Sequence, residues 1–235
     1  MPQANRVTQL PPKAAAPIDD PALPGLFSSD RFDAYLAATG LNQGRAARLY
    51  GWNVAVSSAL WGDFAILEVC LRNAIHACLS AHAGRDDWWN AIRLHPLEVA
   101  KINEATRAAR AKPGHGRPIA GDVVAELTLG FWTGLLVNKY HQRLWVPALS
   151  AAFPHLTTTR REFHRTLERL RKLRNRLAHH EKVFNRNIAD DHQKALEVLA
   201  AIDPAPELLV RTASRVPAVL AARADTVNGT LGVLF

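Results

Sequence analysis

One short run of the sequence combines three side-chain types that suit phosphodiester chemistry. Arg174, Asn175 and His179 lie in the basic run from Arg171 to Glu181. An arginine can hold a phosphate and its developing charge, an amide can orient its neighbours, and a histidine can exchange protons near neutral pH. Asn175 and His179 are four residues apart, so a helix places them on one face. These residues predict a site for phosphodiester chemistry.

Arg174 also has an unusual position in its own helix. A capping box of Thr159 and Glu162 predicts a helix from about residue 159 to about residue 180. Its apolar stripe consists of Phe163, Leu167, Leu170 and Leu177, with Leu173 at its edge. Arg174 falls near the middle of that stripe. Two interpretations stay open, namely a structural arginine that is ion-paired or reaches solvent, and an arginine held at an interface to meet a phosphate.

The spacing of Arg174 and His179 poses a geometric problem. In an unbroken helix, two residues that are five apart point about 140° away from each other. Three solutions are open. The long arginine reaches round the helix, the helix is distorted, or the Arg174 of one chain serves the His179 of another.

A second polar stripe follows an otherwise apolar helix expected over residues 60–83. Glu68, Arg72 and His76 lie at successive steps of four, with Asn73 beside them. The structural interpretation is an ion pair between Glu68 and Arg72, with His76 as a satisfied core group. The alternative is that this stripe supports Arg174 or His179 from behind.

The elements that position these residues are expected to be helices throughout. Apolar residues make up 48% and charged residues 21% of the 235-residue chain, which is typical of a soluble globular protein. Residues 1–26 are proline-rich and predict a flexible tail, followed by a single all-α domain over residues 27–235. Helical patterns outside the two segments above cover residues 29–38, 42–57, 96–111, 122–129, 131–138, 139–153, 188–201 and 206–222.

The charge of the chain indicates an anionic partner, with nucleic acid as the first candidate. The formal net charge is +8, and residues 160–186 alone hold ten basic and three acidic residues. A positive charge concentrated on one helix and its exit favours a phosphate backbone as the ligand. We therefore expect nucleic-acid binding that weakens steeply with salt.

The cysteines and the apolar segments indicate a cytoplasmic protein. Cys70 and Cys78 are eight residues apart on one helix, about 12 Å, which is too far for a disulfide. Polar residues interrupt the most apolar region, from Val54 to Leu79, so no membrane span and no membrane partner are expected. His179, His180 and His192 lack the spacing of zinc ligands, so no metal or other cofactor is expected.

Several blocks of this sequence together resemble a known family. Residues 174–179 (RNRLAH) resemble the Arg-x(4-6)-His motif of HEPN domains. The wider stretches 173–186 (LRNRLAHHEKVFNR) and 67–74 (LEVCLRNA) are similar to the Abi-like branch, a family of bacterial abortive-infection proteins. Residues 49–53 (LYGWN) and 130–132 (GFW) resemble further blocks of that family. The resemblance covers about residues 30–202.

This resemblance implies a HEPN-like helical bundle and a metal-independent endoribonuclease. The 2′-hydroxyl of the RNA would attack the scissile phosphate, with His179 as general acid or base, Arg174 on the phosphate and Asn175 as orienting group. Glu68, Arg72, Asn73 and His180 would support these three. The basic residues expected to contact RNA are Arg171, Lys172, Arg176, Lys182 and Arg186.

The resemblance also implies partners and leaves an alternative open. HEPN domains usually dimerise and form a composite cleft, so a homodimer is expected. The role would be that of a toxin or effector in phage defence, with an antitoxin or a regulatory RNA as a further partner. The alternative is a non-catalytic protein of the same family that binds or senses RNA. A purely structural dimerisation bundle is the third interpretation.

Overall fold

The computed structural model of the chain describes residues 25, 28–112 and 118–235. Within these residues every regular element is helical, which confirms the all-α class. Of the tail expected over residues 1–26, all but Gly25 lies outside the described residues. Contacts divide the chain into two compact units, and the expectation of one domain over residues 27–235 stays a prediction.

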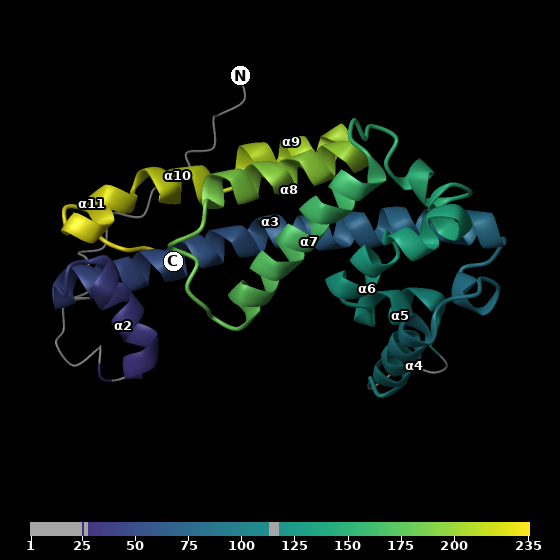
Figure 1. Ribbon diagram of the computed structural model, residues 1–235, viewed down its shortest axis with the longest axis horizontal. Helices are drawn as coiled ribbons and strands as arrows, with labels where there is room; N and C mark the ends of the chain where they lie inside the picture. The colour runs from purple at the N-terminus through teal and green to yellow at the C-terminus, as the bar shows by residue number, and fades with distance from the viewer. Residues whose placement is uncertain (1–24, 26–27, 113–117) are drawn as a thin grey trace, which may run out of the picture. The chain divides into compact units, whose positions relative to one another are not determined.

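Two units share the long helix α3 (Figure 1). The first unit takes in the described residues up to Ala59, with Phe184–Arg186 and Arg215–Phe235, and the second takes in Leu60–Val183 and Asn187–Ser214. The helices and helical turns are α2 (Ser29–Ala38), α3 (Gln43–Ala83), η1 (Trp88–Asn90), α4 (Pro96–Arg110), α5 (Ala120–Glu126), α6 (Leu129–Gly134), η2 (Asn138–Tyr140), η3 (His141–Trp145), η4 (Leu149–Ala152), α7 (Arg160–Ala178), α8 (Ile188–Ile202), α9 (Pro204–Ala213), α10 (Val216–Ala221) and α11 (Arg223–Asn228).

Helix α3 corrects the expectation of two separate helices over residues 42–57 and 60–83. It runs unbroken for 41 residues. The two serines between the expected helices do not stop it, because the Ser57 hydroxyl donates to the carbonyl of Asn53 at 2.7 Å and so finds its partner inside the helix. The helix ends before Gly84, which takes the left-handed conformation with φ of 66°.

Two other expected helices are broken at prolines. Residues 139–153 form short 3₁₀ and π turns instead of one helix, and the π turn η3 ends before Pro147. The expected helix over residues 206–222 is divided between α9 and α10, and Pro217 lies in the first turn of α10. A proline lacks the amide hydrogen that a helix interior needs, so it is accepted only at such starts.

The core of the second unit is built by α3, α7 and the helices packed on them. The second half of α3 buries Leu60, Phe64, Leu67, Leu71, Ile75 and Leu79. Helix α7 buries all five members of its predicted stripe, with α6 and α8 packed against it. The predicted capping box is confirmed, since Thr159 and Glu162 each accept a hydrogen bond from the other's backbone. This packing fixes which face of α7 is turned inward.

The first unit has an aromatic core of its own. Tyr35 packs against Tyr50 and Phe184, with ring centroids 5.2 and 4.7 Å apart. The buried amide of Asn53 accepts a hydrogen bond of 3.1 Å from the backbone of Phe184. The block of residues 49–53 noted in the sequence therefore serves the packing of this unit.

Helix α3 also meets the length and composition of a membrane span. An 18-residue window of α3 has a mean hydropathy of 1.6. Contrary to the expectation, the polar residues between Val54 and Leu79 therefore do not exclude a membrane span by composition. The central helix of a soluble bundle meets the same criterion. Of that window, 44% is buried inside the protein.

Candidate functional site

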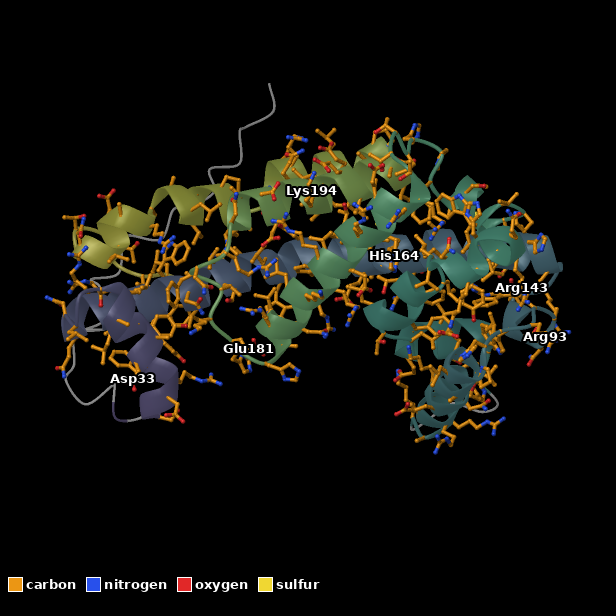
Figure 2. The ribbon with its side chains drawn as sticks, in the orientation of Figure 1. Asp33, Arg93, Arg143, His164, Glu181 and Lys194 are labelled. Carbon is orange, nitrogen blue, oxygen red and sulfur yellow. The ribbon has the colours of Figure 1, made fainter. Side chains whose placement is uncertain are left out.

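A turn at the end of α7 positions the two adjacent histidines. The backbone amide of Glu181 donates to the carbonyl of Arg176 at 2.8 Å, and the backbone amide of His180 donates to the carbonyl of Leu177 at 3.0 Å. These two bonds define a Schellman motif, whose left-handed position is usually a glycine. Here His180 occupies it with φ of 53°. His179 is the C-cap residue, and Figure 2 labels Glu181 in the exposed turn that follows.

Arg174 is held on the inner side of α7 by a carboxylate of α3. Its Nε donates to Glu68 at 2.7 Å, and its guanidinium lies 5.3 Å from the ring centroid of Trp61. The two charged side chains are 32% and 25% exposed, so the pair lies at the edge of the core. A cation over an indole face gains further attraction. The arginine inside the apolar stripe is therefore partnered and partly open to solvent.

The expected ion pair between Glu68 and Arg72 is wrong. Glu68 bonds Arg174 instead, and the Nε of Arg72 is buried with no hydrogen-bond partner among the described residues. Arg72 and Arg174 both lie near Glu68, and it is the guanidinium of Arg174 that donates a hydrogen bond to the carboxylate. Glu68 thus contacts Arg174, as expected if the polar stripe of α3 supports that arginine. The buried Nε of Arg72, in contrast, keeps an N–H donor with no partner among the described residues.

Glu68, Arg72 and Arg174 line a common small cavity. Its volume is about 180 Å³, and residues 125–129 with Trp132 complete the wall. Sites for drug-sized ligands usually occupy about 300–1,000 Å³, so this cavity suits a phosphate-sized anion better than a nucleotide. Two guanidinium groups and two carboxylates line it, and one of these carboxylates, that of Glu126, is paired with Lys112 outside the cavity lining. Its chemistry fits an anion that competes with Glu68 for Arg174.

Asn175 and His179 do not lie in this cavity. Both are exposed, and α7 continues undistorted through Asn175 to Ala178. The His179 imidazole makes no hydrogen bond to another described residue, and nothing joins it to Arg174. The structure therefore brings Arg174 together with Glu68 and Arg72, and leaves His179 about 140° away around α7.

The two remaining supporting residues also lie outside the cavity. Asn73 is exposed on α3, and its side chain has no hydrogen-bond partner among the described residues. His180 is exposed in the turn after α7. Neither contacts Arg174. The support that the structure provides for Arg174 comes from Glu68 and Trp61.

Much of the positive charge of α7 is neutralised by nearby carboxylates. Arg171 bonds Glu168 at 2.8 Å, which raises the pKa of the arginine. Arg169 pairs with two aspartates at the start of α8. Arg176 lies 3.8 Å from Glu181. The charge is therefore less concentrated than the sequence suggests.

A narrower basic stripe remains on the outer face of α7. Arg161, Arg165 and Lys172 are exposed and form no ion pair among the described residues. Their spacing of four and seven places them within about 40° on one face, which His179 extends at the helix end. Of the other predicted RNA contacts, Lys182 is exposed in the second unit, while Arg186 belongs to the first unit.

Sequence reasoning missed two features of this region. The first is Trp61, which lies seven residues before Glu68 on the same face of α3 and covers Arg174. The spacing of seven residues between Trp61 and Glu68 places both on one helix face and could have indicated this contact. The second is a buried pair of Asp63 and His192, 2.7 Å apart and separated by 129 residues, for which no local signal exists.

No cluster of metal-ligating side chains forms within residues 25, 28–112 and 118–235. The chemistry of the site rests on guanidinium, carboxylate, amide and imidazole groups. Comparison of the chain with protein-family models, with curated proteins and with solved structures found no match in any of the three. The resemblance to Abi-like HEPN proteins stays a prediction.

Proposed function

We propose that this protein is a HEPN-like endoribonuclease that cleaves RNA without a metal. The observation that carries the proposal is the placement of Arg174 on a phosphate-sized cavity, with the unused donor of Arg72 beside it. His179 supports it, since it is exposed at the end of the same helix and forms no hydrogen bond or ion pair with another described residue. The basic stripe on the outer face of α7 would attract the RNA backbone.

In the proposed reaction the RNA supplies its own nucleophile. One histidine removes the proton of the ribose 2′-hydroxyl, whose oxygen attacks the adjacent phosphorus. Arg174 stabilises the negative charge of the pentacoordinate phosphorus. The bond to the 5′-oxygen breaks, and the protonated histidine gives its proton to that oxygen. The products are a 2′,3′-cyclic phosphate and a 5′-hydroxyl, and water is not consumed.

The active unit would be a homodimer. Arg174 and His179 diverge around one helix, so they cannot both face one phosphate from a single undistorted α7. A second chain related by a two-fold axis would bring its own His179 to the Arg174 of the first. Each composite site would then hold Arg174 of one chain and His179 of the other, and that histidine would serve first as base and then as acid.

The biological role proposed is that of an RNA-cleaving effector in abortive infection, acting in the cytoplasm. An antitoxin or a regulatory RNA would restrain it. A second candidate is RNA binding without cleavage. The Glu68–Arg174 ion pair favours this alternative, because it already neutralises the arginine that would stabilise the reacting phosphate.

The test is cleavage of total RNA in EDTA by the wild type, Arg174→Ala and His179→Ala. We expect the wild type alone to cleave, with each variant slower by about 10²-fold or more. Exposed residues elsewhere supply the controls Arg107→Ala and His155→Ala, which should cleave normally. Equal activity in all proteins would overturn the catalytic proposal, and cleavage that EDTA abolishes would point to a metal enzyme.

A mixing experiment tests the composite site. Arg174→Ala and His179→Ala are combined, allowed to exchange subunits and assayed together. In a mixed dimer one Arg174 meets one His179, so about a quarter of the wild-type activity should return. A mixture that stays inactive, although co-purification of differently tagged chains shows mixed dimers, would place both residues in one chain. If the wild type binds RNA but no protein cleaves it, the binding function replaces the catalytic one.

A further inference from the structure

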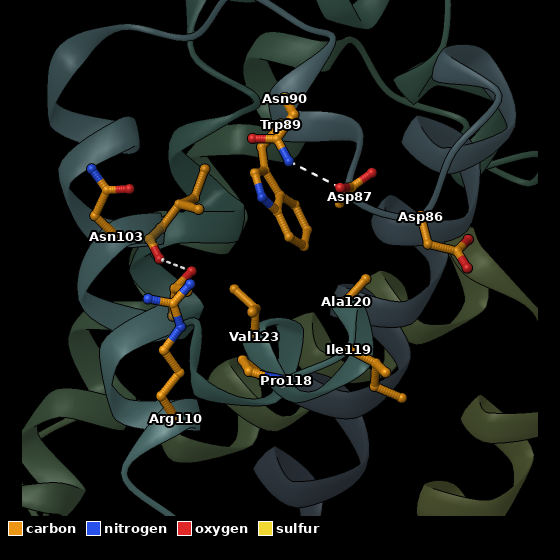
Figure 3. Close-up of a pocket in the computed structure, with 12 residues that line it drawn as sticks. Asp86, Asp87, Trp89, Asn90, Asn103, Arg110, Pro118, Ile119, Ala120 and Val123 are labelled. Atoms are coloured by element: carbon orange, nitrogen blue, oxygen red, sulfur yellow. Dashed lines mark hydrogen bonds between the residues drawn. The ribbon is translucent and has the colours of Figure 1, made fainter. Parts of the chain in front are cut away.

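A larger cavity lies in the second unit, away from Arg174, between η1, α4 and α5 (Figure 3). Its volume is about 500 Å³, within the usual range of small-molecule sites. Its lining combines aliphatic side chains and a threonine with an indole, carboxylates, amides and a guanidinium. The residues that the argument uses are Asp86, Trp89, Asn90, Asn103 and Arg110.

A rigid aromatic platform forms one wall of this cavity. Figure 3 shows the indole of Trp89 projecting into it. Trp89 packs edge-on against the fully buried Trp88, with ring centroids 5.4 Å apart. The indole nitrogen of Trp88 donates to Nδ1 of His76 at 3.1 Å, which anchors the pair to α3. Burial lowers the pKa of His76 and so favours the neutral ring that can accept this bond.

Unpaired charged groups stand on opposite sides of the platform. Asp86 and Arg110 make no hydrogen bond or ion pair among the described residues. Figure 3 places Asp86 and Arg110 on opposite sides of Trp89. Asp87, in contrast, is bound by Arg85 and Asn90, which lower its pKa to about 2. One carboxylate and one guanidinium are thus free for a ligand, with an aromatic face between them.

We propose that this cavity binds a guanine nucleotide. Trp89 would stack on the base, since stacking on an aromatic side chain suits any base. Asp86 can only accept hydrogen bonds when ionised, and guanine is the base that presents two neighbouring N–H donors, N1–H and N2–H, on one edge. Arg110 would pair with the phosphate. The amide of Asn103 lies on the same wall to bind further base or ribose atoms.

This site does not depend on the proposed ribonuclease activity. None of its lining residues belongs to the cavity of Glu68, Arg72 and Arg174. The same chemistry fits a free guanine nucleotide and an unpaired guanylate within RNA. The experiment therefore includes both sources as separate arms.

Calorimetric titration of the full chain with GMP, AMP, CMP and guanosine tests the proposal. GMP should bind, and AMP should bind at least about fivefold more weakly, because the carboxylate then meets no pair of donors. Trp89→Ala should weaken GMP binding at least about fivefold, and Trp89→Phe less. Asp86→Asn should reduce the preference of GMP over AMP. Arg110→Gln should weaken GMP but leave guanosine unchanged.

Competition with hexanucleotides distinguishes the two sources. If r(UUGUUU) displaces GMP and r(UUUUUU) does not, the ligand is a guanylate in RNA, and if neither displaces it, the ligand is a free nucleotide. The control Arg107→Gln lies on the same helix outside the cavity and should bind GMP normally. Arg174→Ala should also bind normally, so loss of ribonuclease activity leaves this result intact. No GMP binding at millimolar concentration, or binding that Trp89→Ala does not change, would overturn the proposal.

Discussion

The carboxylate of Glu68 accepts a hydrogen bond of 2.7 Å from Nε of Arg174, which lies 106 residues later in the chain. This bond joins α3 to α7 at the mouth of a cavity large enough for a phosphate. A phosphate that binds Arg174 must compete with Glu68. The ion pair therefore orients the guanidinium and at the same time limits its affinity for RNA.

Substitution Glu68→Gln should tighten RNA binding. The glutamine keeps the size of the side chain and an acceptor, but removes the charge that competes with a phosphate. We expect the dissociation constant for RNA to fall about fivefold, or ~1 kcal/mol, the order of a partly exposed ion pair. Filter binding at low salt measures it. Glu197→Gln removes the carboxylate of an exposed pair on α8 and should leave RNA binding unchanged. An unaltered constant for Glu68→Gln would argue against phosphate binding at Arg174.

Substitution His180→Gly should stabilise the protein. His180 holds the left-handed position of the Schellman motif, where a Cβ atom is costly and glycine is not. Part of the gain is lost to the greater freedom of glycine in the unfolded chain, so we expect about 0.5–1 kcal/mol more stability. Urea unfolding measures it. The neighbouring His179 has a negative φ of −95°, so His179→Gly should not stabilise. The same sign for both substitutions would contradict this account.

The outer stripe of α7 should determine the salt dependence of RNA binding. The triple variant Arg161→Gln, Arg165→Gln, Lys172→Gln removes three exposed cations. On single-stranded RNA the slope of log K against log salt should become less steep by about 2. The matched triple variant Arg93→Gln, Lys101→Gln, Arg107→Gln removes three exposed cations elsewhere in the second unit and should leave the slope unchanged. Equal effects of the two triples would mean that RNA is held by net charge alone.

Glu98 should make the protein sensitive to acid. Burial tends to raise the pKa of this carboxyl, but hydrogen bonds from Tyr140 at 2.8 Å and Lys139 at 3.1 Å outweigh it and lower the pKa below the ordinary 4.5. Burial also raises the pKa of Tyr140 to about 12, so its hydroxyl stays a donor. The unfolded chain binds the proton more readily, so this stabilisation is present above about pH 4.5 and is lost as the pH falls through the folded value.

The variant Glu98→Gln tests this sign. At pH 7 it should be less stable by about 1–3 kcal/mol, because the charged acceptor is lost. Between neutral and acid pH its stability should fall less steeply than that of the wild type. Urea unfolding across this range measures both effects. Glu104→Gln, an exposed position on the same helix, should follow the wild type. A steeper fall in Glu98→Gln would mean that other groups govern the acid range.

Local patterns predicted the helices and failed at the contacts between them. The capping box of Thr159 and Glu162 and the leucine stripe of α7 depend on residues a few positions apart, so the sequence alone predicted both. Pro147 and Pro217 were also visible in the sequence, and their missing amide hydrogens explain why the expected helices break.

The candidate site was predicted as a set of residues but not as an arrangement. Helical spacing favoured a pair of Glu68 with Arg72, yet the partner of Glu68 depends on how α7 packs against α3. The pair of Asp63 and His192 depends on packing in the same way. Such pairings are decided by tertiary geometry, because each carboxylate has several cations within reach along the chain.

The different directions of Arg174 and His179 on α7 affect how the proposed activity depends on protein concentration. If cleavage needs both side chains at one phosphate, an isolated chain carries two half-sites and a complete site forms only on association. At concentrations well below the dissociation constant, dimers increase with the square of the chain concentration. A tenfold rise in expression would then raise activity about a hundredfold. The amount of protein would itself act as the switch, silent at basal expression and destructive once it accumulates.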